Sequence, residues 1–281
     1  MTTRRTLLCG LAAGVAGSVA TGSAAGAHLA GRNSGVDEGT VTVRVYPDGR
    51  YGWSKSTLRV AADVETAMER IAARVDGTLD RSVTAAVTRE PPLSSDHLSY
   101  DSVSDAIETT RLAVAARGET GEPVCHLLLA RASVNRTIGY GYAGGQVRVG
   151  ADRPGAICLA NVGATELWDG PRVSANMAVQ EVLHAYLTPG ITRAVVGSNC
   201  EHHLGAIRAP APDRRVVTPM ATAYADDTRV GGETRWHGTG CGDPDRLSRR
   251  DETTDDAAWE HTLDPSAATI EATTLYVARY L

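Results

Sequence analysis

Residues 125–130, CHLLLA, constrain the fold of this chain more than any other stretch. This short run is apolar at nearly every position, which is the pattern of a central strand buried on both faces of its sheet. Such a strand needs packing layers above and below it. A chain of 281 residues with 42% hydrophobic content is long enough to build one sizeable core around it.

The segments around this run alternate between strand and helix patterns. Residues 41–46 alternate apolar and polar side chains, and residues 56–75 repeat apolar residues at helical spacing, with Gly77 just beyond. Further strands are expected at 82–87, 137–142 and 156–162, and a further helix at 101–116. This order predicts an α/β class of fold, and the glycine-rich context of 137–142 is typical of an edge strand near a ligand.

The second half of the chain begins with one more helix and then becomes irregular. The helix is expected at residues 174–187, with Ser174 as its N-cap and Pro189, followed by glycine, as its stop. Residues 189–262 are rich in Gly, Pro, Asp and Arg and have little apolar pattern. We therefore expect them to be mostly loop.

A last helix is expected near the end of the sequence. Asp264 is a good N-cap, and Pro265 suits the first turn that follows. We therefore expect a single domain over 41–281. It has a sheet-and-helix half at 41–187 and a loop-rich half with a C-terminal helix at 188–281.

The first residues have the pattern of an export signal. Arg4 and Arg5 form a twin-arginine start, and a weakly apolar run at 8–20 and a zone of small residues follow. The apolar run is too short, and too rich in glycine and alanine, for a stable membrane span. We predict a twin-arginine signal segment at 1–27, a linker at 28–40 and an extracellular location.

Composition and charge exclude several classes of function. The formal net charge is −5, which argues against nucleic acid as the main partner. The sequence has no Gly-x-Ser-x-Gly elbow, no phosphate-binding loop and no dinucleotide fingerprint. The oligomeric state and the substrate stay open.

Four cysteines follow the signal segment, at 125, 158, 200 and 241. An even number of cysteines in an exported protein favours disulfides, and four cysteines allow three connectivities. Position alone suggests a bond from Cys200 to Cys241. No pair has the Cys-x-x-Cys spacing of a structural zinc site.

The motif with the most chemical content is Q-E-V-L-H at 180–184. Residues four apart lie on one face of a helix, so Gln180 and His184 point the same way. Two histidines at this spacing bind one zinc ion in His-Glu-x-x-His peptidases, and the glutamate between them accepts a proton. Here only His184 has the usual ligand chemistry, because Gln180 offers a neutral carbonyl oxygen.

Two later stretches strengthen this interpretation, namely E-H-H-L-G at 201–205 and V-V-T-P-M-A-T-A-Y at 216–224. Together with Q-E-x-x-H and the preceding order of elements, they resemble the metzincin clan of zinc metallopeptidases. The resemblance implies a twisted mixed sheet with packed helices, an edge strand above the cleft, an active-site helix and a methionine turn beneath the metal. The three motifs are also similar to those of a group of exported proteins of halophilic archaea.

The resemblance implies roles for individual residues. Glu181 would be the general base, and His184 and one of His202 or His203 would bind Zn²⁺, with His202 slightly preferred. Met220 would be a structural floor beneath the site. The substrate would be a peptide or protein.

Two other residues have possible roles in the same site. Tyr224 is a candidate hydrogen-bond donor to the transition state. His237 would replace the missing first histidine if its loop folds back, although a solvated role is the more common one for such a residue.

Two departures from the clan leave the activity open. Gln180 stands where the first histidine belongs, and His202 follows His184 after an insertion at 188–200 instead of directly after a glycine turn. One hypothesis is a zinc-dependent peptidase with a variant ligand set that includes Gln180. The other is a catalytically inactive relative, an exported binding or surface protein with the same fold.

Overall fold

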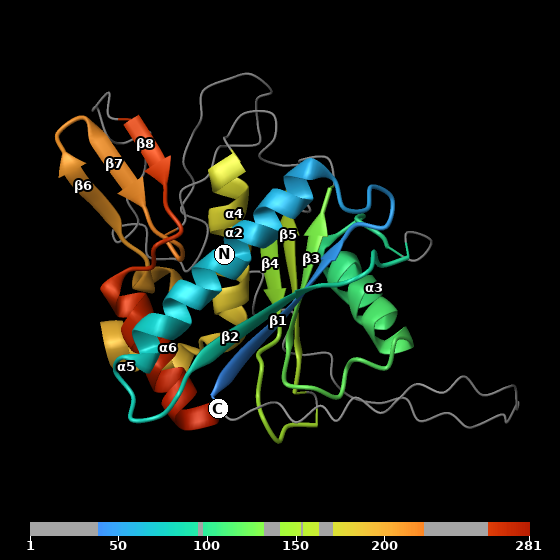
Figure 1. Ribbon diagram of the computed structural model, residues 1–281, viewed down its shortest axis with the longest axis horizontal. Coiled ribbons are helices and arrows are strands. Elements are labelled where there is room, and N and C mark those ends of the chain that lie inside the picture. Colours follow the sequence, from blue (N-terminus) through green and yellow to red (C-terminus); the bar gives the residue numbers. More distant parts are fainter. Residues whose placement is uncertain (1–38, 95–97, 132–140, 153, 163–170, 222–257) are drawn as a thin grey trace, which may run out of the picture. The chain divides into compact units, whose positions relative to one another are not determined.

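The computed structural model describes residues 39–94, 98–131, 141–152, 154–162, 171–221 and 258–281 (Figure 1). The chain divides into a unit at 1–35 and a unit at 36–281, and all described residues belong to the second. The predicted signal segment at 1–27 therefore lies outside the described residues, as do Tyr224, His237 and Cys241.

The main sheet has five strands in the order β2-β1-β3-β5-β4. Their bounds are Thr40–Pro47 (β1), Thr84–Arg89 (β2), Cys125–Ala130 (β3), Gly141–Gly144 (β4) and Ala156–Asn161 (β5). Neighbours among β2, β1, β3 and β5 are parallel, and β4 pairs antiparallel with β5 at the edge. The predicted α/β class with a mixed sheet is confirmed, and it is consistent with a metzincin-like α+β fold.

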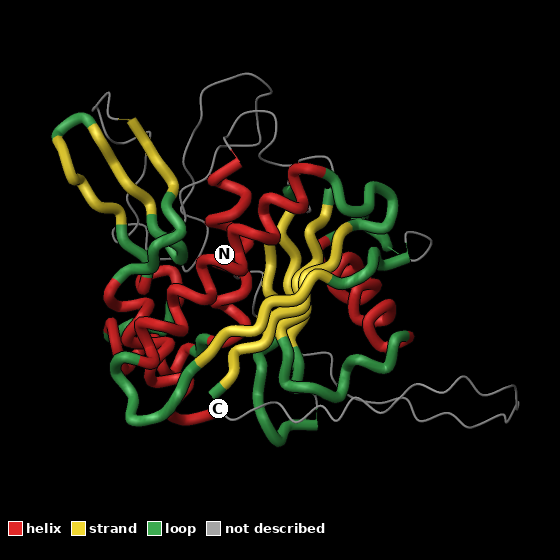
Figure 2. Tube along the Cα trace, in the orientation of Figure 1, coloured by secondary structure: helices red, strands yellow, loops and turns green. Residues whose placement is uncertain are grey.

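Strand β3 is buried at all of its positions, as its apolar sequence predicts. Its alternating side chains enter two different cores. Leu127 and Leu129 join the core formed with helices α2 (Lys55–Asp76), α4 (Pro171–Tyr186) and α6 (Ala267–Tyr280). Leu128 joins the core formed with helix α3 (Val103–Ala116) on the other face (Figure 2).

The long helix α2 follows its predicted bounds because its signals are local. Ser54 caps it by accepting a hydrogen bond from the backbone N–H of Thr57, at 3.2 Å. The buried residues of α2 recur at helical spacing, among them Val60, Val64 and Ile71.

Two predicted caps are wrong. Ser174 does not begin helix α4, which starts at Pro171, and its side chain is buried inside the helix. Helix α6 is capped by Ser266, which accepts a hydrogen bond from the backbone N–H of Thr269 at 3.0 Å, and not by Asp264. At α6 a neighbouring serine thus takes the capping role that was expected of Asp264.

The prediction that residues 189–262 are mostly loop is wrong where the structure describes them. Helix α5 (Pro189–Val196) begins at the proline that was expected only to end the preceding helix, since proline is also favoured in a first turn. A 3₁₀ helix, η2 (Glu201–Leu204), follows. A second sheet has the order β6-β7-β8, with bounds Ile207–Ala211, Arg214–Val217 and Ala258–His261.

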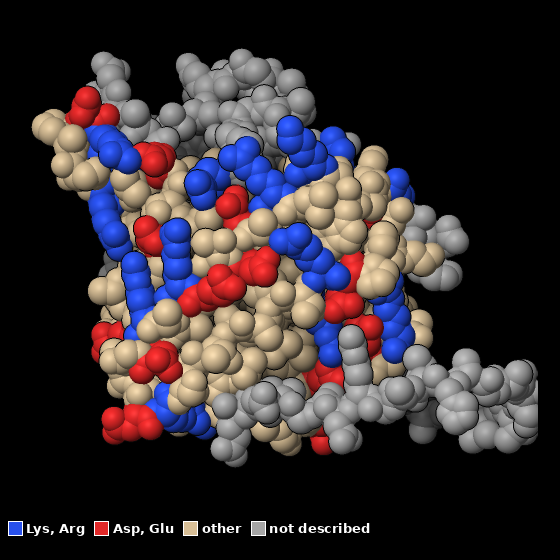
Figure 3. Space-filling model, in the orientation of Figure 1, with Lys and Arg blue, Asp and Glu red and all other residues tan. Residues whose placement is uncertain are grey.

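The surface of the described part carries both signs of charge. On the face drawn in Figure 3, basic and acidic side chains are interspersed. Exposed pairs such as Arg89 with Glu65, at 3.0 Å, contribute little to stability. Within the described residues, no helix is long and apolar enough to cross a membrane.

Candidate metal centre

Helix α4 carries three of the predicted site residues and is unusually buried. It packs against β3, β4 and β5 of the sheet and against α2. The side chains of Gln180, Glu181 and His184 are therefore nearly inaccessible, with exposed fractions of 3%, 5% and 5%. Polar side chains in such a position need polar partners.

The chain after α4 forms the short helix α5 and then returns toward α4 at η2. Thr188 caps α5 by accepting a hydrogen bond from the backbone N–H of Ile191, and Gly197 ends α5 in the left-handed conformation with φ of 69°. Helix η2 then lies next to α4, which explains how His202 approaches His184 across an insertion. The insertion at 188–200, which was expected to loop out, thus consists of helix α5 and a turn.

His184 and His202 meet at their Nε2 atoms, which are 3.1 Å apart. Their rings are nearly perpendicular, with an interplanar angle of 88°. The amide nitrogen of Gln180 lies 3.4 Å from Nε2 of His202. The structure therefore brings together Gln180, His184 and His202.

His203 points to a different partner. Its Nδ1 lies 2.8 Å from the hydroxyl oxygen of Ser198, in the turn before η2. Of the two predicted third ligands, only His202 is placed beside His184. The metal-binding role of these side chains stays a prediction.

The spacing of the three side chains suits a tetrahedral metal. Zinc–nitrogen bonds of about 2.0–2.1 Å place neighbouring ligand atoms about 3.3 Å apart. The distances of 3.1 Å and 3.4 Å around Nε2 of His202 are close to that value. A flip of the Gln180 amide exchanges its nitrogen and oxygen, which allows the oxygen to face the metal.

His184 and His202 supply two imidazole ligands, and a tetrahedral metal needs two more. Among the described residues, no three His, Cys, Asp or Glu side chains form a group that could hold a metal ion. A metal between His184 and His202 would therefore use the amide oxygen of Gln180, together with water.

Glu201 is a member of this cluster that sequence reasoning missed. Its Oε2 makes a short hydrogen bond with Nδ1 of His184, and both side chains are buried. Glu201 precedes His202 in η2, so one turn of chain reaches both nitrogens of the His184 ring. No local pattern predicts this pairing, because it depends on the return of the chain through α5.

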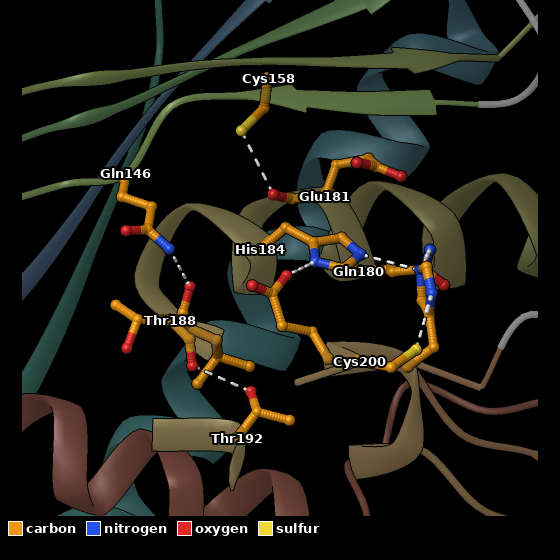
Figure 4. A network of polar contacts seen from close by, with 11 residues as sticks. Gln146, Cys158, Gln180, Glu181, His184, Thr188, Thr192 and Cys200 are labelled. Carbon is orange, nitrogen blue, oxygen red and sulfur yellow. Dashed lines mark hydrogen bonds and ion pairs between the residues drawn. The ribbon is translucent and has the colours of Figure 1, made fainter. Parts of the chain in front are cut away.

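Glu181 lies against the edge strand of the main sheet. A Cβ atom at Gly141 would stand 2.8 Å from both Cγ and Oε1 of Glu181, so only glycine leaves room for this carboxylate. In the view of Figure 4, the side chains of Glu181 and His184 extend from α4 toward the same side. Glu181, the predicted general base, thus lies beside β4, which shares only residues 141 and 142 with the strand expected at 137–142; residues 137–140 lie outside the described part.

Met220 lies in a turn whose backbone packs against Gly205, the residue after η2. It is fully buried and has φ of 74°, which is uncommon for a residue other than glycine. A Cβ atom at Gly205 would stand 1.9 Å from the backbone nitrogen of Ala221, so the end of η2 rests directly on this turn. The floor role implied for Met220 stays a prediction.

The cysteine prediction is wrong for one pair. Cys125 and Cys158 are free and buried in neighbouring parallel strands, with their sulfur atoms 3.7 Å apart. Cys158 also donates a hydrogen bond of 3.2 Å to the backbone oxygen of Glu181 (Figure 4). Its contact with Cys125, followed by burial, raises the pKa of the Cys158 thiol, so it stays protonated. The Cys200–Cys241 bond stays a prediction, because Cys241 is outside the described residues.

Comparison with known proteins gives little additional guidance. No protein-family model matches the chain, and no curated protein matches it. One similar solved structure is metalloproteinase-II from Bacteroides fragilis, at 13% sequence identity and a TM-score of 0.36. The match covers 53% of this chain and 42% of the length of that protein, and likeness at this level assigns neither fold nor activity.

Proposed function

We propose that this chain binds a divalent metal ion, Zn²⁺, between His184, His202 and the amide oxygen of Gln180, and that it hydrolyses peptide bonds at this site. The observation that carries the proposal is the distance of 3.1 Å between the two Nε2 atoms. Two imidazole nitrogens in a buried site need a proton or a metal ion between them, because two lone pairs repel each other.

The side chains around the pair have complementary roles in this proposal. Lewis-acid polarisation of a peptide carbonyl and of water is the chemistry that zinc supplies when bound. Glu181 accepts the proton of the attacking water and then donates it to the leaving amine. Gly141 leaves the space in which the Glu181 carboxylate is held against β4.

The predicted alternative is a catalytically inactive relative, an exported binding or surface protein with the same fold. Two observations favour it. Gln180 is a weaker zinc donor than the imidazole at the corresponding position of the peptidases. The side chains of Gln180, Glu181 and His184 are at most 5% exposed, as in a structural site.

Zinc content tests the metal site. The full chain is equilibrated with Zn²⁺, dialysed and analysed for metal, alongside His184→Ala, His202→Ala and His203→Ala. The wild type and His203→Ala should retain about one zinc ion, whereas the other two variants should lose it. His203 is a matched control because it neighbours His202 but contacts Ser198. A wild type without zinc would refute the proposed site.

Hydrolysis of an unfolded protein substrate separates the two functions. The peptidase hypothesis expects cleavage that a chelator stops and that Glu181→Gln abolishes while zinc is retained. Zinc binding without such cleavage would support the inactive relative.

Export is also part of the proposed function. We attribute it to the twin-arginine start at Arg4 and Arg5. Changing both arginines to lysine should retain the full-length chain inside cells that export the wild type. Equal secretion of both proteins would contradict this assignment.

A further inference from the structure

The environment of His184 differs at its two ring nitrogens. Nδ1 faces the Glu201 carboxylate, and Nε2 faces Nε2 of His202. A carboxylate only accepts hydrogen bonds, so the proton on this side of the ring belongs to Nδ1. The lone pair of Nε2 then points toward His202, which is the orientation that a metal ligand requires.

Burial of the pair stabilises this orientation of the His184 ring. The side chains of His184 and Glu201 are 4% and 6% exposed, so solvent does not compete effectively for their hydrogen bond. Glu201 belongs to the same turn as His202, so the backbone of η2 couples the two contacts. A displacement of this turn would move both partners of His184 together.

The turn is itself held by the C-terminal helix. The backbone oxygen of Leu204, the last residue of η2, accepts hydrogen bonds from the hydroxyls of Ser266 and Thr269. These residues form the N-cap and first turn of α6. Gly205, the residue after Leu204, packs directly against the backbone of Met220 and Ala221. The η2 turn that carries Glu201 is therefore held in place by α6 and by the turn at Met220.

From this geometry we infer that Glu201 is a positioning residue, which fixes His184 as the Nδ1–H tautomer and directs its Nε2 lone pair into the candidate metal site. The inference deepens the proposed function and rests on it for the identity of the metal. Carboxylates that orient ligand histidines typically change metal affinity by roughly 10–100-fold when they are removed.

The tautomer is measured directly in the metal-free full chain. Nitrogen-15 chemical shifts of the imidazole rings distinguish Nδ1–H from Nε2–H, and the His184 signals are identified by their loss in His184→Gln. The wild type should show Nδ1–H. Glu201→Gln should retain this tautomer, because its amide oxygen still accepts the hydrogen bond, whereas Glu201→Ala should shift it toward Nε2–H.

Zinc affinity provides the second measurement. Competition with a chelator should give a dissociation constant roughly 10–100-fold weaker for Glu201→Ala, with a smaller loss for Glu201→Gln. Glu271→Gln is the matched control, because Glu271 lies exposed on α6. Its affinity and tautomer should equal those of the wild type.

The outcomes separate the inference from the proposed function. An Nε2–H tautomer in the wild type, or an unchanged tautomer in Glu201→Ala, would overturn the role of Glu201. The wild-type spectrum decides this even if Glu201→Ala does not fold. If the tautomer responds as expected but the chain takes up no zinc, the metal site fails while the positioning of His184 by Glu201 stands.

Discussion

His126 should make the stability of this protein fall in acid, independently of the candidate metal centre. It lies on β3 with an exposed fraction of 1%, and its Nδ1 is 2.9 Å from the hydroxyl of Tyr46. That hydroxyl donates to Glu119 at 2.6 Å, so its oxygen accepts from Nδ1–H of His126. Nε2 is buried without a hydrogen-bond partner among the described residues.

This environment disfavours the charged imidazolium. Burial, and then the positive charge of Arg44, lower the pKa of His126 from 6.5 to about 4. Between these values the unfolded chain binds a proton that the folded chain does not. Stability is therefore lost as the pH falls through this window, by about 1.4 kcal/mol per pH unit. Between pH 7.5 and 4.5 the loss from His126 amounts to about 2.5 kcal/mol.

Replacing His126 with leucine should remove this loss. Urea unfolding followed by tryptophan fluorescence gives the free energy of unfolding at pH 7.5 and pH 4.5. The difference between the two should be about 2.5 kcal/mol smaller in His126→Leu than in the wild type, whatever the variant costs at neutral pH. Titrating groups that do not interact with His126 contribute about equally to both proteins and cancel.

Tyr46→Phe is the control for this experiment. It removes the hydroxyl but leaves His126 buried, so most of the pH dependence should remain, because burial is the main cause of the lowered pKa. If His126→Leu loses as much stability in acid as the wild type, the account of a neutral, buried His126 is refuted.

Two glycine substitutions and one core truncation test the packing around the site. Gly141→Ala should displace Glu181, whose Cγ lies 2.8 Å from the new Cβ, and should reduce hydrolysis more than tenfold while zinc content is unchanged. Gly205→Ala should destabilise the fold by about 3 kcal/mol or more in urea unfolding, because the new Cβ would stand 1.9 Å from a backbone nitrogen; unchanged stability would contradict the contact with the Met220 turn. Leu128→Ala should cost about 2–5 kcal/mol in the same assay, since Leu128 is fully buried, and a cost below 1 kcal/mol would contradict that burial.

The elements that sequence reasoning predicted well are those with local signals. The apolar run of β3 is buried on both faces as expected, and α2 combines a serine cap with a long apolar face. Helix α5 and the small sheet β6-β7-β8 were missed because each of their elements is at most eight residues long. Their stability comes from contacts with distant segments, which a short window does not contain.

In the candidate site, too, only the features with local sequence signals could be predicted. The spacing of Gln180 and His184 within one helix predicts that they share a face, and they do. The choice between His202 and His203 could not be made from sequence, because adjacent residues in a 3₁₀ turn point in different directions. The pairing of Glu201 with His184 depends on the path of α5, which no motif encodes.

The hydrogen bonds from α6 to Leu204 have a consequence for the timing of folding. Their donors, Ser266 and Thr269, follow Leu204 by 62 and 65 positions in the sequence. At roughly 5–20 residues per second, translation needs several seconds to supply them after η2 has been made. A nascent chain therefore contains His184 and His202 well before Ser266 and Thr269 are available to bond Leu204. The candidate metal centre is thus completed only at the last stage of the protein's maturation.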